Sequence, residues 1–322
     1  MTLSQFISTM NSWGQAQVPF LFMIDFEMSD PRIFKIEDIA FDRILYSVNG
    51  ITNAERKPST GSSSFRAIQG PFSDYERKFK KVRDHLKYGD TFLTNLTIST
   101  EIILDQPLRN IFFESDAKYK LFVEDQFLVF SPETFVKIAN GKIFSYPMKG
   151  TIDSSIPDAK TKILLDKKEL AEHVTIVDLI RNDLSQVASR VTVNRFRYVE
   201  EVRTRSKNLF QVSSEISGEL DSDYRSSIGD TMVKLLPAGS VTGAPKPKTV
   251  QIIKDVEGEP RGFYTGVFGY FDGSNLDSGV MIRFIERRGD KYFYRSGGGI
   301  TTQSVVESEY QEAINKVYVP VA

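Results

Sequence analysis

The chain of 322 residues contains no cysteine and only two histidines, His85 and His173. Without cysteine it can form no disulfide, no thiolate nucleophile and no cysteine-ligated zinc site, which agrees with a reducing compartment. Two histidines cannot build a histidine-rich metal site. The sequence also lacks any apolar run of about 18 residues, and residues 1–12 show neither the basic nor the apolar region of a secretory signal. We therefore expect a cytoplasmic protein without a membrane-spanning segment.

Neither sign of charge is in excess. Lysine and arginine number 41 against 42 aspartates and glutamates, which gives a net charge of -1. A chain without a strong net field has no general attraction for nucleic acid or for an anionic membrane, so we expect neither as a partner. Any anionic ligand must be held by local groups. The 40% of apolar residues is sufficient for a sizeable core.

Strand and helix patterns come in blocks, without regular alternation of strand and helix. Strand patterns cover residues 18–26, 91–104, 118–130, 134–144, 262–272, 278–287 and 291–296. Helical patterns cover residues 73–87, 167–187, 228–235, 248–257 and 306–317, the first with an N-cap signal at Ser73 and Asp74, while residues 51–64 form a polar loop. This arrangement predicts an α+β (mixed α/β) fold in which large antiparallel sheets pack together with helices on the outside.

The strongest helical pattern is that of residues 167–187. Apolar residues recur at spacings of three and four, with a further pair on another side of the helix: Leu170, Val174, Val177, Ile180, Leu184 and Val187, then Ile176 and Leu179. Such a helix is buried on more than one face. Near its start, Glu172 either complements the helix dipole or holds a cation beside a pocket, and the helix alone leaves both open.

A single lysine stands in a tight turn, Pro147-Met148-Lys149-Gly150-Thr151, directly after the strand-like residues 142–146. Gly150 removes a side chain that would block the approach of a ligand to the backbone. Alone, the turn favours a lysine that points into water. Among other chemically active residues, Lys149 becomes a candidate nucleophile.

Three carboxylates form a candidate metal site. Glu309 and Glu312 lie three residues apart and therefore on one face of the last predicted helix, with Lys316 one turn later. A solvated Glu/Lys face is the ordinary interpretation of this spacing. Together with Glu172, however, these carboxylates suit a hard cation such as Mg²⁺.

Three further features are open to a structural or a functional interpretation. Residues 236–247 lack the spacing of a phosphate loop, and they form either a structural turn or a cradle of backbone N–H groups for an anion. The triplet Gly297-Gly298-Gly299 lacks the dinucleotide pattern and favours close approach of the backbone to a ligand. Arg283 lies in a strand pattern, where it is either exposed or buried with a carboxylate of the protein or of a ligand.

These pieces occur in the order of a known family. The chain resembles the chorismate-utilising enzymes, which include anthranilate synthase component I, aminodeoxychorismate synthase component I, isochorismate synthase and salicylate synthase. The resemblance covers roughly residues 70–320 and rests on Ser131-Pro132-Glu133, Pro147-Met148-Lys149-Gly150-Thr151, Ala171-Glu172-His173, residues 177–184, 239–246 and 261–266, Ile282-Arg283 and residues 297–316. It implies an anthranilate synthase component I-like fold in one chorismate-binding domain of residues 1–322, with a short variable part at 1–70 and a catalytic core at 71–322.

The lysine of the turn separates the reactions within this family. Other members resemble one another in having alanine there, whereas aminodeoxychorismate synthase component I has lysine, as this chain does at Lys149. The resemblance implies that chorismate and ammonia become 4-amino-4-deoxychorismate through a covalent lysine intermediate, on the way to 4-aminobenzoate and folate. Anthranilate synthase component I, isochorismate synthase and a non-catalytic binding subunit are the alternatives.

The same resemblance assigns roles to residues. Glu133 matches the general acid that protonates the leaving C4 hydroxyl, and Glu172, Glu309 and Glu312 match the ligands of Mg²⁺. The residues of the substrate anion site are Thr242, Gly243, Tyr264, Arg283, Gly297, Gly298, Gly299 and Lys316. Because the attacking amine must be neutral, we expect burial and a nearby cation to lower the pKa of Lys149.

At two positions the residue type differs from that of family members that catalyse other reactions. Gln211 stands where many members have a histidine, and Leu93 stands where water-adding members place a lysine base. The second argues against isochorismate synthase. Nothing in the chain resembles a glutamine amidotransferase, so the resemblance implies a separate glutaminase subunit as the source of ammonia and a separate pyridoxal-phosphate lyase to complete the aromatic product. The short N-terminal part argues against a tryptophan-type regulatory pocket and against the usual surface for docking a glutaminase.

Overall fold

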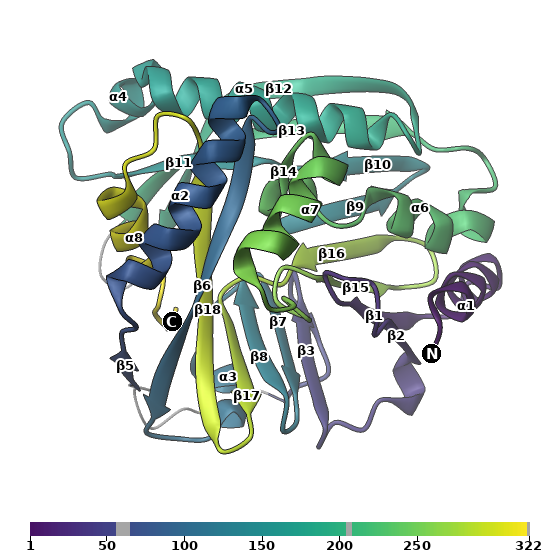
Figure 1. Ribbon diagram of the computed structural model, residues 1–322. Coiled ribbons are helices and arrows are strands. Elements are labelled where there is room, and N and C mark those ends of the chain that lie inside the picture. The colour runs from purple at the N-terminus through teal and green to yellow at the C-terminus, as the bar shows by residue number, and fades with distance from the viewer. Residues whose placement is uncertain (56–64, 204–207, 321–322) are drawn as a thin grey trace.

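The computed structural model describes residues 1–55, 65–203 and 208–320. In these residues the chain forms two nine-stranded sheets, and every pairing of neighbouring strands is antiparallel. Helices lie beside and over the sheets (Figure 1). This confirms the predicted α+β class with large antiparallel sheets. No described helix is long and apolar enough to cross a membrane.

The first sheet has the order β11-β13-β10-β9-β16-β15-β1-β2, with β12 also paired to β13. Its strands are β1 (Phe20–Ile24), β2 (Arg32–Lys35), β9 (Thr134–Ala139), β10 (Lys142–Ser145), β11 (Met148–Asp153), β12 (Ser189–Arg203), β13 (Asn208–Glu219), β15 (Val267–Phe271) and β16 (Leu276–Val280). The strand pattern predicted at 134–144 is the hairpin of β9 and β10, which pair around Asn140 and Gly141.

The second sheet has the order β14-β6-β18-β17-β8-β7-β3-β4, with β5 paired to β6. Its strands are β3 (Ile44–Val48), β4 (Ile51–Thr52), β5 (Phe65–Ile68), β6 (Leu93–Leu104), β7 (Tyr119–Val123), β8 (Phe127–Ser131), β14 (Gly243–Ala244), β17 (Phe284–Arg288) and β18 (Lys291–Ile300). The strand predicted at 118–130 is the hairpin β7–β8. The polar loop predicted at 51–64 lies mostly outside the described residues.

The helices are α1 (Leu3–Gln15), α2 (Phe72–Tyr88), α3 (Leu108–Glu114), α4 (Ala159–Leu165), α5 (Lys167–Leu184), α6 (Ile228–Leu235), α7 (Lys246–Glu257) and α8 (Val306–Asn315), with 3₁₀ turns η1 (Ile36–Asp38), η2 (Tyr224–Ser227) and η3 (Gly239–Val241). All five predicted helices are confirmed. The predicted N-cap of α2 is wrong, because the helix begins after Pro71 without a side-chain cap.

Helix α5 shows where periodicity misled. Leu170 and Val174, predicted to be buried, are 38% and 47% exposed, whereas Ile176 and Leu179 are buried. The helix packs on β11, β13 and η3, and Val177 and Leu184 of the first predicted set are buried as well as Ile176 and Leu179. A helix with apolar residues on two sides does not reveal by its spacing which side its neighbours will cover.

The apolar strand β1 shows why the two sheets share one core. Leu21 and Met23 lie in a cluster with residues of β3, β7 and β8 from the second sheet. Phe20 and Phe22 lie in another cluster, with residues of α1, α5 and α6. Burial on both faces explains the continuous apolar run. Residues 1–70 supply strands to both sheets.

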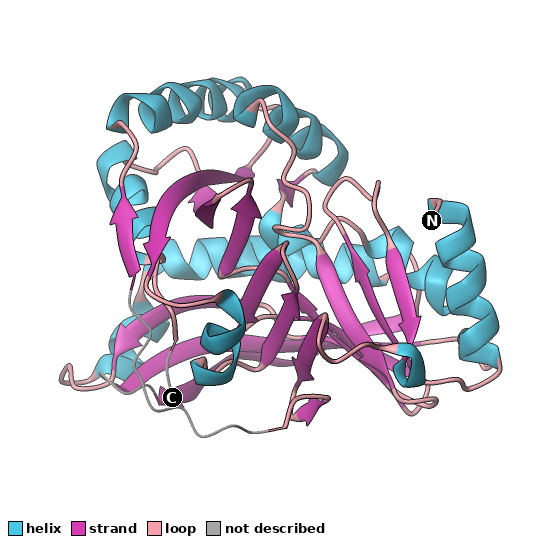
Figure 2. Cartoon of the chain, turned by 90° about the horizontal axis from the view of Figure 1, so that it is seen from below, coloured by secondary structure: helices cyan, strands magenta, loops and turns pink. Residues whose placement is uncertain are grey.

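The arrangement of the sheets determines where a cavity can form. In Figures 1 and 2 the strands of the first sheet cross those of the second, and α5 lies across the end of the molecule that carries β11. Helix α8 packs on β18, while α5 packs on β11. The loop between β8 and β9 passes from the second sheet to the first and carries Glu133. These elements surround the candidate site.

Candidate active site

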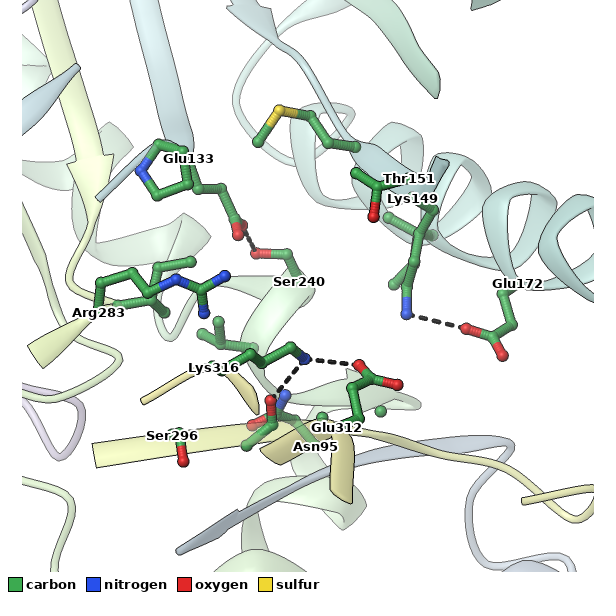
Figure 3. Close-up of a pocket in the computed structure, with 18 of the residues that line it drawn as sticks. Asn95, Glu133, Lys149, Thr151, Glu172, Ser240, Arg283, Ser296, Glu312 and Lys316 are labelled. Carbon is green, nitrogen blue, oxygen red and sulfur yellow. Dashed lines mark hydrogen bonds and ion pairs between the residues drawn. The ribbon is translucent and has the colours of Figure 1, made fainter. Parts of the chain in front are cut away.

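A cavity of about 590 Å³ lies between β11 and α5 on one side and β18 and α8 on the other (Figure 3). All the predicted site residues except Gly243 line it. They are Glu133, Lys149, Glu172, Thr242, Tyr264, Arg283, Gly297, Gly298, Gly299, Glu309, Glu312 and Lys316. Residues far apart in the chain therefore meet in one pocket, as a binding site requires.

A break in the β11–β13 ladder aims Lys149 into the cavity. The pairing register shifts between Met148 and Thr151, so Lys149 and Gly150 lie at a β-bulge, a common means of redirecting a side chain. Gly150 has a φ of +84°, and a Cβ there would lie 3.0 Å from Glu169 Oε2. Lys149 Nζ donates a hydrogen bond to Glu172 Oε2 at 2.9 Å, and Figure 3 shows this pair at one side of the cavity.

The charge state of Lys149 differs from the expectation. Burial lowers the pKa of this lysine, but the carboxylates of Glu172, Glu169 and Glu312 outweigh burial, and the pKa is raised above its ordinary value. The predicted depression is therefore wrong for the protein without substrate. The reason is tertiary, because α5 brings Glu169 and Glu172 to the same side of the lysine, and carboxylates stabilise an ammonium. The resting lysine is an ammonium ion.

Glu133 has the environment of a general acid. Burial raises the pKa of its carboxyl, against the opposing effect of the Ser240 hydroxyl and nearby cations. Ser240 Oγ donates a hydrogen bond to Glu133 Oε1, and the backbone N–H of Glu133 donates to Ser131 Oγ at 3.1 Å. A buried carboxyl that stays protonated can give its proton to a leaving oxygen.

Two cationic side chains lie apart from Lys149 in the cavity (Figure 3). Arg283 was predicted to lie within a strand. It lies instead at the break between β16 and β17, with a φ of +54°. Among the described residues, its buried Nε has no hydrogen-bond partner. Lys316 Nζ donates to Gly297 O at 2.8 Å and to Glu312 Oε1 at 2.7 Å. A guanidinium with an unsatisfied donor suits an anionic ligand.

Gly297 and Gly298 of β18 are glycines for different reasons. All three glycines of the triplet continue the β18–β6 ladder. A Cβ on Gly297 would lie 2.5 Å from the backbone oxygen of Leu96, which the sheet cannot accept. A Cβ on Gly298 would find only side-chain atoms at 3.6 Å or more, from Glu312, Glu309 and Lys316. Gly297 serves the sheet, while Gly298 faces the cavity.

Gly243 also serves the backbone. Its φ is +136°, and a Cβ would lie 1.8 Å from the backbone oxygen of Leu93, because β14 pairs with β6 at this point. It does not appear among the residues that line the cavity. The neighbouring Thr242 does line it, although its hydroxyl donates to Ala238 O at 3.0 Å within the chain's own turn. Tyr264 is buried in the cavity wall.

The predicted metal ligands share the cavity but do not form a metal site as they stand. Within residues 1–55, 65–203 and 208–320, no group of three or more His, Cys, Asp or Glu side chains is close enough together to hold an ion. Glu172 comes from α5 and holds Lys149, whereas Glu309 and Glu312 come from α8. Carboxylates are suitable donors for magnesium, but the ion stays a prediction.

Sequence reasoning missed several residues of the cavity. Glu169 lies one turn before Glu172 on the same face of α5, a signal that was available in the spacing. Ser240 lies in η3, within a segment that was interpreted as a structural turn or as a cradle of backbone N–H groups. Its contact with Glu133 depends on the fold, because the two residues are distant in the chain. Gln211 and Leu93, noted as departures from relatives, both line the cavity.

His173 has a structural environment that the sequence did not suggest. It follows Glu172 on α5 and is 1% exposed. Burial, with the charges of Arg197 and Lys149, lowers the pKa of His173 to about 4, while the nearby backbone carbonyl of Lys149, an acceptor for the ring N–H, opposes this. The imidazole is therefore neutral at pH 7 and lies against the backbone of the lysine strand.

The cavity lies between two antiparallel sheets and combines buried acidic groups with cationic side chains. Such a combination is typical of the class of enzymes that bind a small anion. Comparison with known proteins identifies the family. Residues 35–322 match the family described as chorismate binding enzyme. The chain belongs to this family of chorismate-utilising enzymes.

Two sequence relatives and one solved structure are similar to this chain. An uncharacterized PabA-like protein of Haemophilus influenzae is 46% identical over 99% of this chain and 98% of its own length. Aminodeoxychorismate synthase component 1 of Bacillus subtilis is 30% identical over 91% of this chain and 63% of its own length. The crystal structure of anthranilate synthase component I from Streptococcus pneumoniae has a TM-score of 0.67 and 26% identity, covering 81% of this chain and 62% of that one. The chain thus spans less than two thirds of the last two proteins.

Proposed function

We propose that this protein catalyses the aminodeoxychorismate synthase reaction, in which chorismate and ammonia become 4-amino-4-deoxychorismate. The observation that carries the proposal is the position of Lys149 Nζ, which faces the cavity from a β-bulge. Glu133, with a raised pKa, lines the same cavity. A nucleophile and an acid in one pocket are what a covalent displacement needs. The name of the Bacillus subtilis relative supports the same reaction.

The reaction proceeds in two displacements. The neutral amine of Lys149 attacks C2 of the chorismate ring, the ring double bonds shift, and the C4 hydroxyl leaves as water with the proton of Glu133. Ammonia then attacks C4, the bond between C2 and Nζ breaks, the lysine leaves as a neutral amine, and the new ammonium at C4 returns a proton to the Glu133 carboxylate. Water is exchanged for ammonia overall. Splitting one difficult substitution into two steps is the usual benefit of covalent catalysis.

Lys149 must lose a proton before it can attack. The resting ammonium donates to Glu172 Oε2 at 2.9 Å, so this carboxylate is placed to take the proton. The carboxylates that raise the pKa of Lys149 also keep the amine inactive until that transfer occurs. The lysine therefore becomes nucleophilic only when substrate binding changes the charges around it.

The cations of the cavity suit a dianionic substrate. Arg283 has a buried donor without a partner among the described residues, and Lys316 directly follows the last residue of helix α8. A planar guanidinium binds a carboxylate through two hydrogen bonds, which orients the ring as well as holding it. We assign the substrate carboxylates to these two residues.

Two neutral residues of the cavity limit the outcome of the reaction. Gln211 lies on β13 opposite Thr151 and lines the cavity. An amide does not act as a base near neutral pH, so it does not remove a ring proton, and pyruvate stays on the product. Leu93 offers no base to activate water, which argues against isochorismate formation.

Ammonia must come from elsewhere, because the chain has no cysteine with which to hydrolyse glutamine. We propose a separate glutamine amidotransferase subunit as the partner. A separate pyridoxal-phosphate lyase would then release pyruvate and form 4-aminobenzoate. Both assignments extend the chemistry of the proposed product and follow from the family resemblance.

The test is a product assay on the purified chain. It is incubated with chorismate, ammonium and Mg²⁺, and the product is identified by mass and by its conversion on addition of the lyase. We expect 4-amino-4-deoxychorismate, and Lys149→Ala should lower the rate by at least about 10³-fold, since loss of a nucleophile removes the covalent route. Lys80→Ala, on the exposed side of α2, is the matched control and should leave the rate unchanged.

Other products would redirect the proposal. Fluorescent anthranilate formed without added lyase would assign the chain to the anthranilate synthase reaction. Undiminished amination by Lys149→Ala would refute the lysine mechanism. If the chain binds chorismate, as measured by protection against thermal unfolding, and forms no product, it is a binding subunit.

Magnesium is a separate proposal. Glu172, Glu309 and Glu312 would hold the ion, since their oxygens match its chemistry. Chelation should stop turnover, and added Mg²⁺ should restore it. Calorimetric titration of the substrate-free chain with Mg²⁺ gives a readout besides activity, and full activity in excess chelator would reject the ion.

A further inference from the structure

The bulge that presents Lys149 also removes its backbone from the regular β11–β13 ladder. A lysine at such a position needs support from outside the sheet if its amine is to be held in place. Two successive residues of α5 lie against it. Glu172 accepts a hydrogen bond from Nζ. The next residue, His173, has a buried Nδ1 without a hydrogen-bond partner among the described residues, and the Lys149 carbonyl is near enough to raise the pKa of its ring against the effect of burial.

The other side of the His173 ring is fixed by a buried serine. His173 Nε2 lies 2.7 Å from Ser214 Oγ on β13, and Ser214 is 0% exposed. The backbone N–H of Ser214 donates to Pro147 O at 3.0 Å, just before the bulge. Ser214 therefore holds both the turn that leads to Lys149 and the ring that supports it.

The hydrogen bonds of Ser214 determine which ring nitrogen carries the proton. The backbone N–H of Arg197 donates to Ser214 Oγ at 3.0 Å. The serine must place its own proton on an acceptor, and among the contacts of the described residues that acceptor is His173 Nε2. A buried hydroxyl without an acceptor costs free energy. In a neutral imidazole one nitrogen accepts and the other donates, so the proton lies on Nδ1.

The backbone conformation of Arg197 allows its N–H to reach Ser214 Oγ. Its φ is +48°, and the pairing of β12 with β13 shifts register between Arg195 and Tyr198. Its guanidinium donates to Leu164 O at 2.7 Å and to Ile163 O at 3.0 Å, at the end of α4. The arginine thus anchors an irregular backbone whose N–H points at the serine.

We propose that His173 is a positioning residue, whose Nδ1–H is directed at the carbonyl of Lys149 and holds the backbone of that lysine. The ring is itself fixed by a series of hydrogen bonds, from the Arg197 N–H to Ser214 Oγ and from Ser214 Oγ to His173 Nε2. Its Nδ1 is buried and has no partner of regular hydrogen-bond geometry among the described residues. The inferred bond requires a small shift of the bulge that brings the Lys149 carbonyl to this donor. The inference rests on the proposed role of Lys149.

The first test is spectroscopic and needs no activity. With only two histidines in the chain, ¹⁵N-labelled histidine gives two ring systems, and a His85→Gln variant assigns them. One- and two-bond ¹⁵N–¹H correlations should place the His173 proton on Nδ1. In Ser214→Ala this preference should be reduced. A wild-type proton on Nε2 would overturn the inference.

The second test is kinetic. His173→Leu should lower kcat by about 30- to 100-fold, because a displacement of about 1 Å can cost two orders of magnitude. The KM for chorismate should change by less than about threefold, since the anion site is intact. His173→Asn retains an N–H donor and should recover about tenfold of the loss. His85→Gln, at a surface contact with Asp90, is the matched control and should match wild type.

The outcomes separate this inference from the proposed function. An inactive Lys149→Ala combined with a fully active His173→Leu overturns the role of His173 and leaves the lysine mechanism standing. An active Lys149→Ala refutes the lysine mechanism, whatever the tautomer. If His173→Leu does not fold, the wild-type tautomer and the kcat of Ser214→Ala decide, and wild-type kcat in the latter counts against the inference.

Discussion

Two strands face the cavity from opposite sides, β11 and β18, and they differ in regularity. β18 pairs with β6 residue by residue from Tyr292 opposite Ile102 to Ile300 opposite Thr94, without a register shift. β11 pairs with β13 around a bulge at Lys149 and Gly150. The regular strand carries glycines, while the irregular strand carries the lysine. Where the ladder is regular, the missing side chains leave room for a ligand, and where it is broken, a side chain reaches toward it.

The two sides are also supported differently. The β6 side is held by Arg261, whose buried guanidinium donates to Asn95 O and Val241 O, each at 2.8 Å. On the β11 side, Glu172 of α5 accepts a hydrogen bond from Lys149, and the support inferred from His173 comes from the same helix. The paired strands β6 and β18 therefore form a fixed platform, and they face a lysine whose position depends on a few polar contacts. Changes to the platform should act on stability or binding, and changes beside the reacting groups should act on rate.

The largest expected effect concerns the platform. Arg261→Met removes the partner of Glu257, with which Arg261 forms a buried ion pair at 2.7 Å. Leaving a buried charge unpaired costs about 3–5 kcal/mol, which urea denaturation will measure. The exposed pair Lys80–Glu76 provides the control, since Lys80→Ala should cost less than about 1 kcal/mol. Equal stabilities of the two variants would contradict the assigned support.

The next largest effects are expected for two glycines of β18, one of which contacts the backbone of β6 while the other faces the cavity. Gly297→Ala places a Cβ 2.5 Å from Leu96 O, and the required backbone shift should destabilise the protein by about 1–3 kcal/mol. Gly298→Ala finds ordinary contacts and should fold normally, but the added methyl should raise the KM for chorismate by about tenfold. Denaturation and steady-state kinetics on both variants separate the roles. A reversed pattern would show that Gly297 is the residue beside the ligand.

The smallest effect is a shift in pH dependence. The Ser240 hydroxyl stabilises the ionised form of Glu133 and so opposes the rise of its pKa by burial. Ser240→Ala removes this donor, so the pKa of Glu133 rises further and the acid stays protonated to higher pH. The alkaline limb of kcat/KM should therefore move upward by about one pH unit or less. A limb that stays in place or moves downward would remove Glu133 from the role of acid.

The sequence was informative where local pattern and order suffice. The helices α2, α5 to α8 and the hairpin β9–β10 follow from periodicity and turn residues. Helix α1 was missed because it buries only Phe6, Met10 and Gly14, too few apolar positions for a clear pattern. The strand predicted at 278–287 ignored the break at Arg283, since a positive φ at a non-glycine residue leaves no mark in the sequence.

The amino-acid sequence alone determined which residue types were available and in what order, and this was enough to predict the class of fold and to select Lys149, Glu133 and their companions as one site. Only the tertiary structure decided the charge of Lys149, the contact of Ser240 with Glu133 and the support from His173. Each depends on distances between groups far apart in the chain, and electrostatic and hydrogen-bond energies are set by those distances and by burial.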